Sequence, residues 1–248
     1  MADNAQVNSS VAVSLPDPSR CSGCSVGDLC VALGSDAQTL RKLDELLDIR
    51  EPIAAGDHIL VQSDPFRGLL AVRRGLFKSY TTDREGREQI QGFYLPGELI
   101  GLEGVSRGHY GANVQALSDA AICRLDYDAL LKISACSTGL QQQLFRLFSS
   151  RLASQHWRTG DFAAIERLAV FLLDVSERFE QRGENGTAFE LPMARSDIAN
   201  FLGLATETVS RAFGRLASNN IISVRRKQVR IVDREALLAA AGAAGEAT

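Results

Sequence analysis

The stretch from Arg195 to Leu216, RSDIANFLGLATETVSRAFGRL, decides how the C-terminal part of the chain folds. It predicts two short helices joined by a tight turn at Gly203, because glycine readily takes the left-handed conformation that ends a helix. The second helix has apolar residues at spacings of three and four, which predicts a buried stripe of Val209, Ala212, Phe213 and Leu216. Two helices that cross closely in this way are typical of a helix-turn-helix.

The opposite face of the second helix carries side chains suited to reading DNA bases. Glu207 can accept a hydrogen bond from a cytosine amine, Arg211 can bond guanine at two points, and Ser210 is versatile. An ordinary helical hairpin can show the same polar residues to solvent. The stretch alone therefore leaves both interpretations open.

Charge is distributed unevenly along the 248 residues. The net charge is −3, but residues 191–234 carry eight Lys and Arg and three acids, about +5, so the remainder carries about −8. A basic module on an acidic body is typical of a protein that binds double-stranded DNA.

A β-hairpin with a basic tip is predicted after the two helices. In IISVRRKQVRIVD, residues 221–233, apolar residues alternate on both sides of Arg225, Arg226 and Lys227. Such a hairpin is called a wing. Its tip lies outside the second helix, which carries the side chains suited to reading bases. We therefore expect the three basic side chains to contact DNA phosphates rather than bases.

The overall composition is that of a globular protein with one or two domains, at 45% hydrophobic and 23% charged residues. No apolar run is long enough to span a membrane, and the N-terminus shows no secretory signal. We expect a cytoplasmic protein without a membrane partner. In that reducing compartment the five cysteines are not expected to form a disulfide framework.

Three cysteines lie close together after a polar segment, residues 1–20, that we expect to be a disordered arm. In CSGCSVGDLC, a short loop can wrap Cys21, Cys24 and Cys30 around one metal ion or cluster. Three ligands are one short of the usual four, so the fourth is either Cys123 or Cys136. Zinc competes as the metal, and three idle reduced thiols are the remaining alternative.

Between these two regions the chain alternates between helical and strand patterns. Residues 36–50 predict an amphipathic helix, and residues 51–126 predict short strands broken by Gly and Asp, as in a small antiparallel barrel or sandwich. Residues 138–163 predict a long helix, and residues 164–182 predict another. On the long helix, Leu140, Leu144, Leu147 and Arg151 form a heptad-like seam, so we expect a dimer coiled coil. The alternative is a helix packed on its own barrel.

In this order, the features resemble those of the CRP/FNR transcription regulators, and most closely the oxygen-responsive iron–sulfur branch. The resemblance runs from about Cys21 to Leu238. It rests on the helix-turn-helix stretch and on CSGCSVGDLC, GLFKSYTTDREGREQIQGFYLPGELIG, QALSDAAICRLD and ERLAVFLLDVSERFEQRG. It implies an α+β protein with four parts: a disordered arm (1–20), a cluster loop and β-roll sensor domain of the cyclic-nucleotide-binding type (21–137), a dimerisation helix (138–163), and a winged helix-turn-helix domain (164–248).

The resemblance implies a [4Fe-4S] cluster on Cys21, Cys24, Cys30 and Cys123, with Cys136 as a plain core thiol. It implies that the intact cluster favours a homodimer that binds a palindrome similar to TTGAT-N4-ATCAA, with Glu207, Ser210 and Arg211 reading bases. It also implies that oxygen converts the cluster and weakens the dimer. In relatives a corresponding hairpin tip is an activating surface, so contact with RNA polymerase is expected at the tip that carries Asp83, Arg84, Glu85 and Arg87; a solvated turn without a partner is the alternative.

Several residues depart from the family pattern. Ala205 stands where the recognition helix usually has a Ser or Thr cap, which loses about 1 kcal/mol, and Thr206 is the candidate to replace it at the DNA backbone. Gln155 stands where some relatives place a repelling Asp on the dimer helix, so we expect a leaky switch. Residues 109–112, HYGA, lack the Arg–Ser pair that binds a cyclic nucleotide phosphate, so cyclic AMP is not expected.

The leading hypothesis is an oxygen-sensing transcription regulator of anaerobic or microaerobic genes. An iron–sulfur enzyme is disfavoured, because the sequence shows no nucleophile–base pairing and no nucleotide-binding glycine motif. A zinc-stabilised constitutive DNA binder is the main alternative. A relative that senses haem ligands or nitric oxide is the other.

Overall fold

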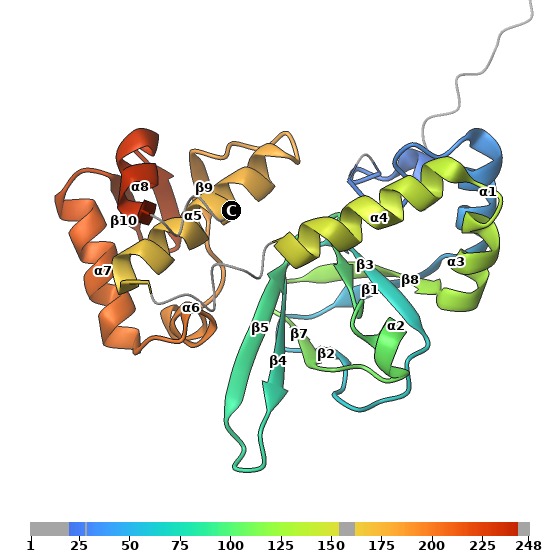
Figure 1. Cartoon of the computed structure of the whole chain (residues 1–248), viewed down its shortest axis with the longest axis horizontal. Helices are drawn as coiled ribbons and strands as arrows, with labels where there is room; N and C mark the ends of the chain where they lie inside the picture. Colours follow the sequence, from blue (N-terminus) through green and yellow to red (C-terminus); the bar gives the residue numbers. More distant parts are fainter. Residues whose placement is uncertain (1–19, 28, 154–161, 243–248) are drawn as a thin grey trace, which may run out of the picture.

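The chain folds into an N-terminal β-roll domain, a long helix and a C-terminal domain of helices with a small sheet (Figure 1). The computed structural model describes residues 20–27, 29–153 and 162–242. The predicted disordered arm therefore lies outside the described residues, apart from Arg20. Within the described part, no helix is long and apolar enough to cross a membrane.

Two four-stranded antiparallel sheets face each other in the β-roll. Their strand orders are β1-β8-β3-β6 and β2-β7-β4-β5. The strands are β1 (Asp48–Ile53), β2 (His58–Leu60), β3 (Gly68–Arg74), β4 (Phe77–Thr82), β5 (Glu88–Tyr94), β6 (Leu99–Ile100), β7 (Asn113–Ala116) and β8 (Ala120–Asp126). Inward side chains such as Val72, Phe77 and Ile122 fill the space between the sheets. The predicted antiparallel barrel or sandwich is confirmed.

Helices cover the outer face of the first sheet. They are α1 (Ala37–Leu46), α3 (Tyr127–Ser134) and α4 (Thr138–Ala153), together with the cysteine loop and its short 3-10 helix η1 (Cys21–Gly23); α2 (Gly104–Arg107) lies between β6 and β7. Leu43, Leu130 and Leu140 form the core of this layer with Leu125 of β8.

The helix predicted over residues 36–50 is shorter than expected. It ends at Leu46, and residues from Asp48 onward pair with β8 as β1. Two causes act together. Pro52 disfavours helix in the residue before it, and β1 gains a ladder of hydrogen bonds along the edge of β8.

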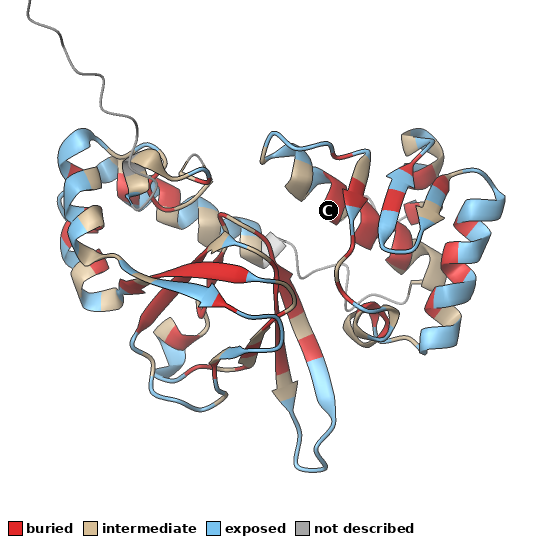
Figure 2. Ribbon diagram, turned by 180° about the vertical axis from the view of Figure 1, so that it is seen from behind, coloured by how far each residue is buried: buried red, intermediate tan, exposed pale blue. Residues whose placement is uncertain are grey.

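The C-terminal domain is a winged helix-turn-helix, as predicted. Its elements are α5 (Ala164–Glu180), β9 (Ala188–Glu190), α6 (Arg195–Leu202), α7 (Thr206–Ser218), β10 (Ile222–Arg225), β11 (Gln228–Ile231) and α8 (Arg234–Ala241). The strands form a sheet in the order β10-β11-β9. Figure 2 shows buried residues concentrated on the inward faces of these helices and strands. One apolar core includes α5, α6 and α7 and continues to Phe93 and Ile90 of the β-roll.

Two adjacent leucines of α3 differ in burial but share the same helix, so comparing their variants isolates the effect of burial on stability. Leu130 is 2% exposed and Leu131 is 47% exposed. Leu130→Ala should lower the free energy of unfolding by about 2–5 kcal/mol, because it opens a cavity in the layer under the cysteine loop. Leu131→Ala should change it by about 0.5 kcal/mol or less. Urea unfolding of both variants measures this, and equal losses would contradict the assigned core.

Candidate metal centre and nucleic-acid interface

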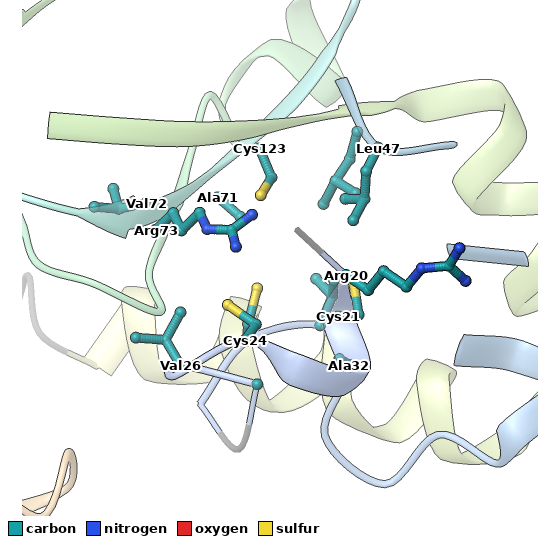
Figure 3. Close-up of a pocket in the computed structure, with 14 residues that line it drawn as sticks. Arg20, Cys21, Cys24, Val26, Ala32, Leu47, Ala71, Val72, Arg73 and Cys123 are labelled. Atoms are coloured by element: carbon teal, nitrogen blue, oxygen red, sulfur yellow. The ribbon is translucent and has the colours of Figure 1, made fainter. Parts of the chain in front are cut away.

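Four of the five cysteines line one cavity between the cysteine loop and the outer face of the β3–β8 pair (Figure 3). Cys21, Cys24 and Cys30 come from the loop. Cys123 comes from β8, where it pairs with Ala71 of β3 and with Ile49 of β1. The structure thus brings together the four cysteines that the resemblance implied, from segments about a hundred residues apart.

The cavity is small and its walls are largely apolar. Its volume is about 20 Å³, and Val26, Val31 and Leu125 are among the lining residues. Among the described residues, no three Cys, His, Asp or Glu side chains gather closely enough to hold a single metal ion. The donor set, four thiols around one cavity, is the one that iron–sulfur clusters use, with each thiolate on a different iron.

Burial favours the protonated form of three of these thiols, those of Cys21, Cys30 and Cys123, in the metal-free chain. It raises the pKa of Cys21 to about 12, with a further contribution from the Asp44 carboxylate, and it raises the pKa of Cys30 to about 12. Burial also raises the pKa of Cys123, and the nearby guanidinium of Arg73 partly opposes that rise. Because thiolates bind metals, loading this site has to release protons.

Arg73 is a site residue that sequence reasoning missed. Figure 3 shows its side chain extending into the cavity beside Cys123. Its positive charge suits a site where several thiolates gather, because it offsets their mutual repulsion. The strand alternation could have indicated it, since Ala71 and Arg73 share the face of β3 that lies next to Cys123.

Cys136 lies away from the cavity and is exposed. The prediction that it is a core thiol is therefore wrong. The residue follows the last turn of α3, in the short connection to α4, where the backbone turns at the surface.

The cysteine loop is tied to the helices beneath it. The Gln143 amide of α4 is only 4% exposed and donates a 3.1 Å hydrogen bond to the Cys30 carbonyl oxygen. The backbone N–H of Cys21 donates a 2.6 Å hydrogen bond to the Asp44 carboxylate of α1. These bonds couple the position of the loop to α1 and α4.

The predicted dimer seam faces the chain's own β-roll domain. Leu140 is fully buried there, and Leu144 and Leu147 are half-buried against the same core. Arg151 donates a 2.9 Å hydrogen bond to the Tyr94 hydroxyl. The assignment of Leu140 to an intermolecular seam is wrong, because its side chain has no surface left for a partner. Gln155 lies outside the described residues.

A different face of α4 is open to solvent. Phe145 is 74% exposed, and Phe148 beside it is half-buried. The apolar period that predicted the seam also suits a helix lying on its own barrel, and a partner contact at Leu144, Leu147 and Arg151 stays a prediction. The exposed Phe145 marks the face that remains available.

The helix-turn-helix matches the sequence expectation closely. Gly203 ends α6 in the left-handed conformation, with φ 66°. Val209 and Leu216 of α7 are fully buried, and Ala212 and Phe213 nearly so. The opposite face exposes Glu207, Ser210, Arg211 and Thr206. Ala205 precedes α7 without a side-chain cap, as predicted, so the first-turn amides lack a side-chain partner from the preceding residue.

The wing is the predicted hairpin in its predicted register. Ile222 pairs with Ile231 and Val224 with Val229, which leaves a two-residue turn at Arg226 and Lys227. Arg225, Arg226 and Lys227 are all exposed at this tip. The tip therefore presents a compact positive surface on the same domain as α7.

The tip of the β4–β5 hairpin is exposed and ordered by its own hydrogen bonds. The Asp83 carboxylate accepts from the Glu85 N–H at 2.8 Å and from Arg87 Nε at 2.7 Å. The bonds from Arg87 are the main cause of the lowered pKa of Asp83. Arg87 also pairs with Glu85 at 2.8 Å, whereas Arg84 is exposed at the tip.

Comparison with known proteins gives consistent matches over nearly the whole chain. A cyclic nucleotide-binding domain matches residues 50–135, and a Crp-like helix-turn-helix domain matches residues 166–240. The transcriptional activator protein FnrA of Stutzerimonas stutzeri is 35% identical over 97% of this chain and 100% of its own length. The fumarate and nitrate reduction regulatory protein of Escherichia coli is 35% identical over 90% of each chain. The structure of FixK2 from Bradyrhizobium japonicum is 27% identical, with a TM-score of 0.71 over 79% of this chain and 98% of that one.

Proposed function

Because this chain belongs to the CRP/FNR family of DNA-binding transcription regulators, we propose that it senses oxygen through a [4Fe-4S] cluster and thereby controls anaerobic or microaerobic genes. Members of this family are regulators rather than enzymes, and they act as dimers. The names of the relatives, an activator and a regulator of fumarate and nitrate reduction, support the proposed role in anaerobic metabolism.

One observation carries the proposal: four thiols from separate segments line a single cavity beside Arg73. Cys21, Cys24, Cys30 and Cys123 would hold the cluster, which would supply a redox-active centre that oxygen can convert. Such a cluster would join the loop cysteines to Cys123 of β8, so its loading and loss would shift the loop relative to the sheet. Through the Gln143 bond, that movement would reach α4.

Reading of the operator is assigned to α7. Glu207, Ser210 and Arg211 lie on its exposed face, which would enter the major groove of a palindrome similar to TTGAT-N4-ATCAA. Thr206 begins the helix, where uncapped amides suit a phosphate. The wing tip would contact the backbone beside it.

We assign the dimer contact to the exposed face of α4 centred on Phe145. A 74% exposed phenylalanine on a helix of a protein that acts as a dimer is best explained by burial against the partner. The distance from Phe148 to Gln155 is seven residues, one heptad, so the sequence places both on one helical stripe. The leaky switch expected from Gln155 stays a prediction, as does a polymerase contact at the tip that carries Asp83.

The proposal is tested by anaerobic purification. Iron and sulfide analysis should give about four of each per chain, and binding to the palindrome should fall after exposure to air. A colourless protein that contains zinc and binds DNA equally in both states would refute oxygen sensing and support a constitutive regulator.

The fourth cluster ligand is tested by two matched serine variants. Cys123→Ser should lose most of the iron, because one of the four thiols around the cavity is gone, whereas Cys136→Ser should retain the wild-type iron content. Anaerobic iron analysis measures both. Loss of the cluster in Cys136→Ser with retention in Cys123→Ser would show that the assignment is wrong.

The wing and the recognition helix should differ in specificity. Arg226→Ala should weaken binding to all DNA about equally and reduce the salt slope by roughly one unit, because it removes one phosphate contact. Arg211→Ala should cost about 1–3 kcal/mol at the palindrome and little on unrelated DNA. Titrations at several salt concentrations measure both, and a palindrome-selective loss in Arg226→Ala would contradict the phosphate assignment.

The dimer face is tested on the exposed side of α4. Phe145→Ala should weaken the dimer by about 2 kcal/mol per protomer, the cost of losing one buried aromatic contact, without lowering the stability of the fold. Leu131→Ala is the control, since it removes another exposed apolar side chain from a different helix. Anaerobic sedimentation measures the dimer, and an unchanged dimer in Phe145→Ala would move the interface to another face.

A further inference from the structure

The C-terminal domain is hydrogen-bonded to the free edge of a β-roll strand. β5 is the last strand of its sheet, so backbone groups along one side lack a strand partner. The Asn200 side chain of α6 fills this position. Its Oδ1 accepts from the Ile90 N–H at 2.7 Å, and its Nδ2 donates to the Glu88 carbonyl at 2.7 Å. One amide thus replaces a short piece of neighbouring strand, which few other side chains can do.

A second polar contact lies close to the first. The Lys78 side chain of β4 is 10% exposed, and its ammonium lies 3.2 Å from the Asp197 carboxylate of α6. The Gln89 side chain also donates a 3.1 Å hydrogen bond to the Asn200 carbonyl. These bonds hold the start of β5 against α6 (Figure 1).

The other end of β5 is held by α5. Arg178 forms a two-point ion pair with the Glu98 carboxylate, at 2.8 Å through Nε and 2.8 Å through Nη2. Nη2 also donates to the Phe93 carbonyl at 2.8 Å. Both charged side chains are mostly buried, and two-point pairs of this kind fix orientation as well as distance.

Aromatic packing joins the two polar contacts. The ring of Phe93 lies 6.2 Å from that of Phe171 and 5.2 Å from that of Phe201, measured between centroids. The three rings belong to the core that runs from the β-roll into the C-terminal domain. The domain is therefore held in one orientation along the length of β5.

This docking leaves the DNA-reading surface free. Glu207, Ser210 and Arg211 remain exposed while Asn200 is bonded to β5. A contact that blocked DNA binding would cover them. The arrangement instead fixes where α7 lies relative to the β-roll and, through the β-roll, relative to the dimer helix α4.

We infer that Asn200 is a positioning residue that sets the spacing of operator half-sites this regulator accepts. The inference rests on the proposed binding of a palindrome by a dimer. Each added base pair moves a half-site by about 3.4 Å and turns it by about 35°, so a firmly held α7 tolerates one spacing only. If the Asn200 contact is lost, the domain can adjust its position, and the preference for that spacing weakens.

The cysteine loop lies against the same docking site. A methyl group on Gly97 would lie 2.7 Å from the Leu29 Cβ of the loop, and the next residue, Glu98, holds Arg178. The state of the loop therefore bears on the far end of β5 as well as on α4.

The test uses full-length, cluster-loaded protein and palindromes whose spacer is the native length or is one or two base pairs longer. Asn200→Ala should bind the native spacing about tenfold more weakly, because weaker docking lowers the fraction of dimers that hold both domains in the orientation this spacing needs, and should bind the longer spacers as the wild type does. A single half-site should be bound equally by both proteins. Asn113→Ala is the matched control, because Asn113 also bonds a backbone N–H, that of Gln62, but within the β-roll.

A variant that keeps the full preference for the native spacing would overturn the inference. An equal loss on the single half-site would also overturn it, because Asn200 would then act on the reading helix itself. Hydrogen exchange at the Ile90 amide gives a readout without DNA: it should speed up in Asn200→Ala but not in Asn113→Ala, and an unchanged rate would overturn the docking. If the wild type does not bind the palindrome selectively but its Ile90 amide is protected from exchange, the proposed function is refuted and the docking contact is not.

Discussion

The register of β8 between β1 and β3 is the constraint on which the rest of the N-terminal domain depends. Ile122 points into the core between the two sheets, and its neighbour Cys123 points out to the cysteine loop. Because side chains alternate along a strand, a slip by one residue would turn the thiol into the core of the roll and turn the isoleucine towards the cysteine loop. The pairing of Cys123 with both Ile49 and Ala71 fixes the choice, and two apolar layers stabilise it from opposite sides.

Local signals were strong enough to predict most of the fold. The left-handed Gly203, the buried stripe of α7 and the wing register all depend on residues within a few positions of one another. Most strands of the β-roll were also predicted, because turn residues separate them; β1 and the two-residue β6 were not. The end of α1 was not, since the extended state of Asp48 is decided by pairing with β8, far along the chain.

The candidate sites divide in the same way. The exposed face of α7 follows from helical period alone. The grouping of Cys123 with the loop cysteines came from a family resemblance, because sequence spacing gives no distance between Cys30 and Cys123. The apolar stripe of α4 left two surfaces open, a partner subunit and the chain's own barrel, because a stripe does not say which surface it meets; Leu140 meets the barrel. Arg73 and Asn200 were missed because their partners are backbone or thiol groups brought near only by the tertiary fold.

The bond from Gln143 to the Cys30 carbonyl has a thermodynamic consequence. The Gln143 donor lies on the same helix as the exposed Phe145, two residues away, so in the proposed dimer the occupant of the cysteine site and the partner subunit would act on one element. Thermodynamic linkage then makes the two effects equal. If the occupant raises the affinity between protomers by some factor, dimerisation raises the affinity of the site for the occupant by the same factor. A regulator already assembled on its operator would give up its cofactor less readily than the same chain free in solution. The response of each promoter would then depend on what fraction of it the regulator occupied before exposure to oxygen.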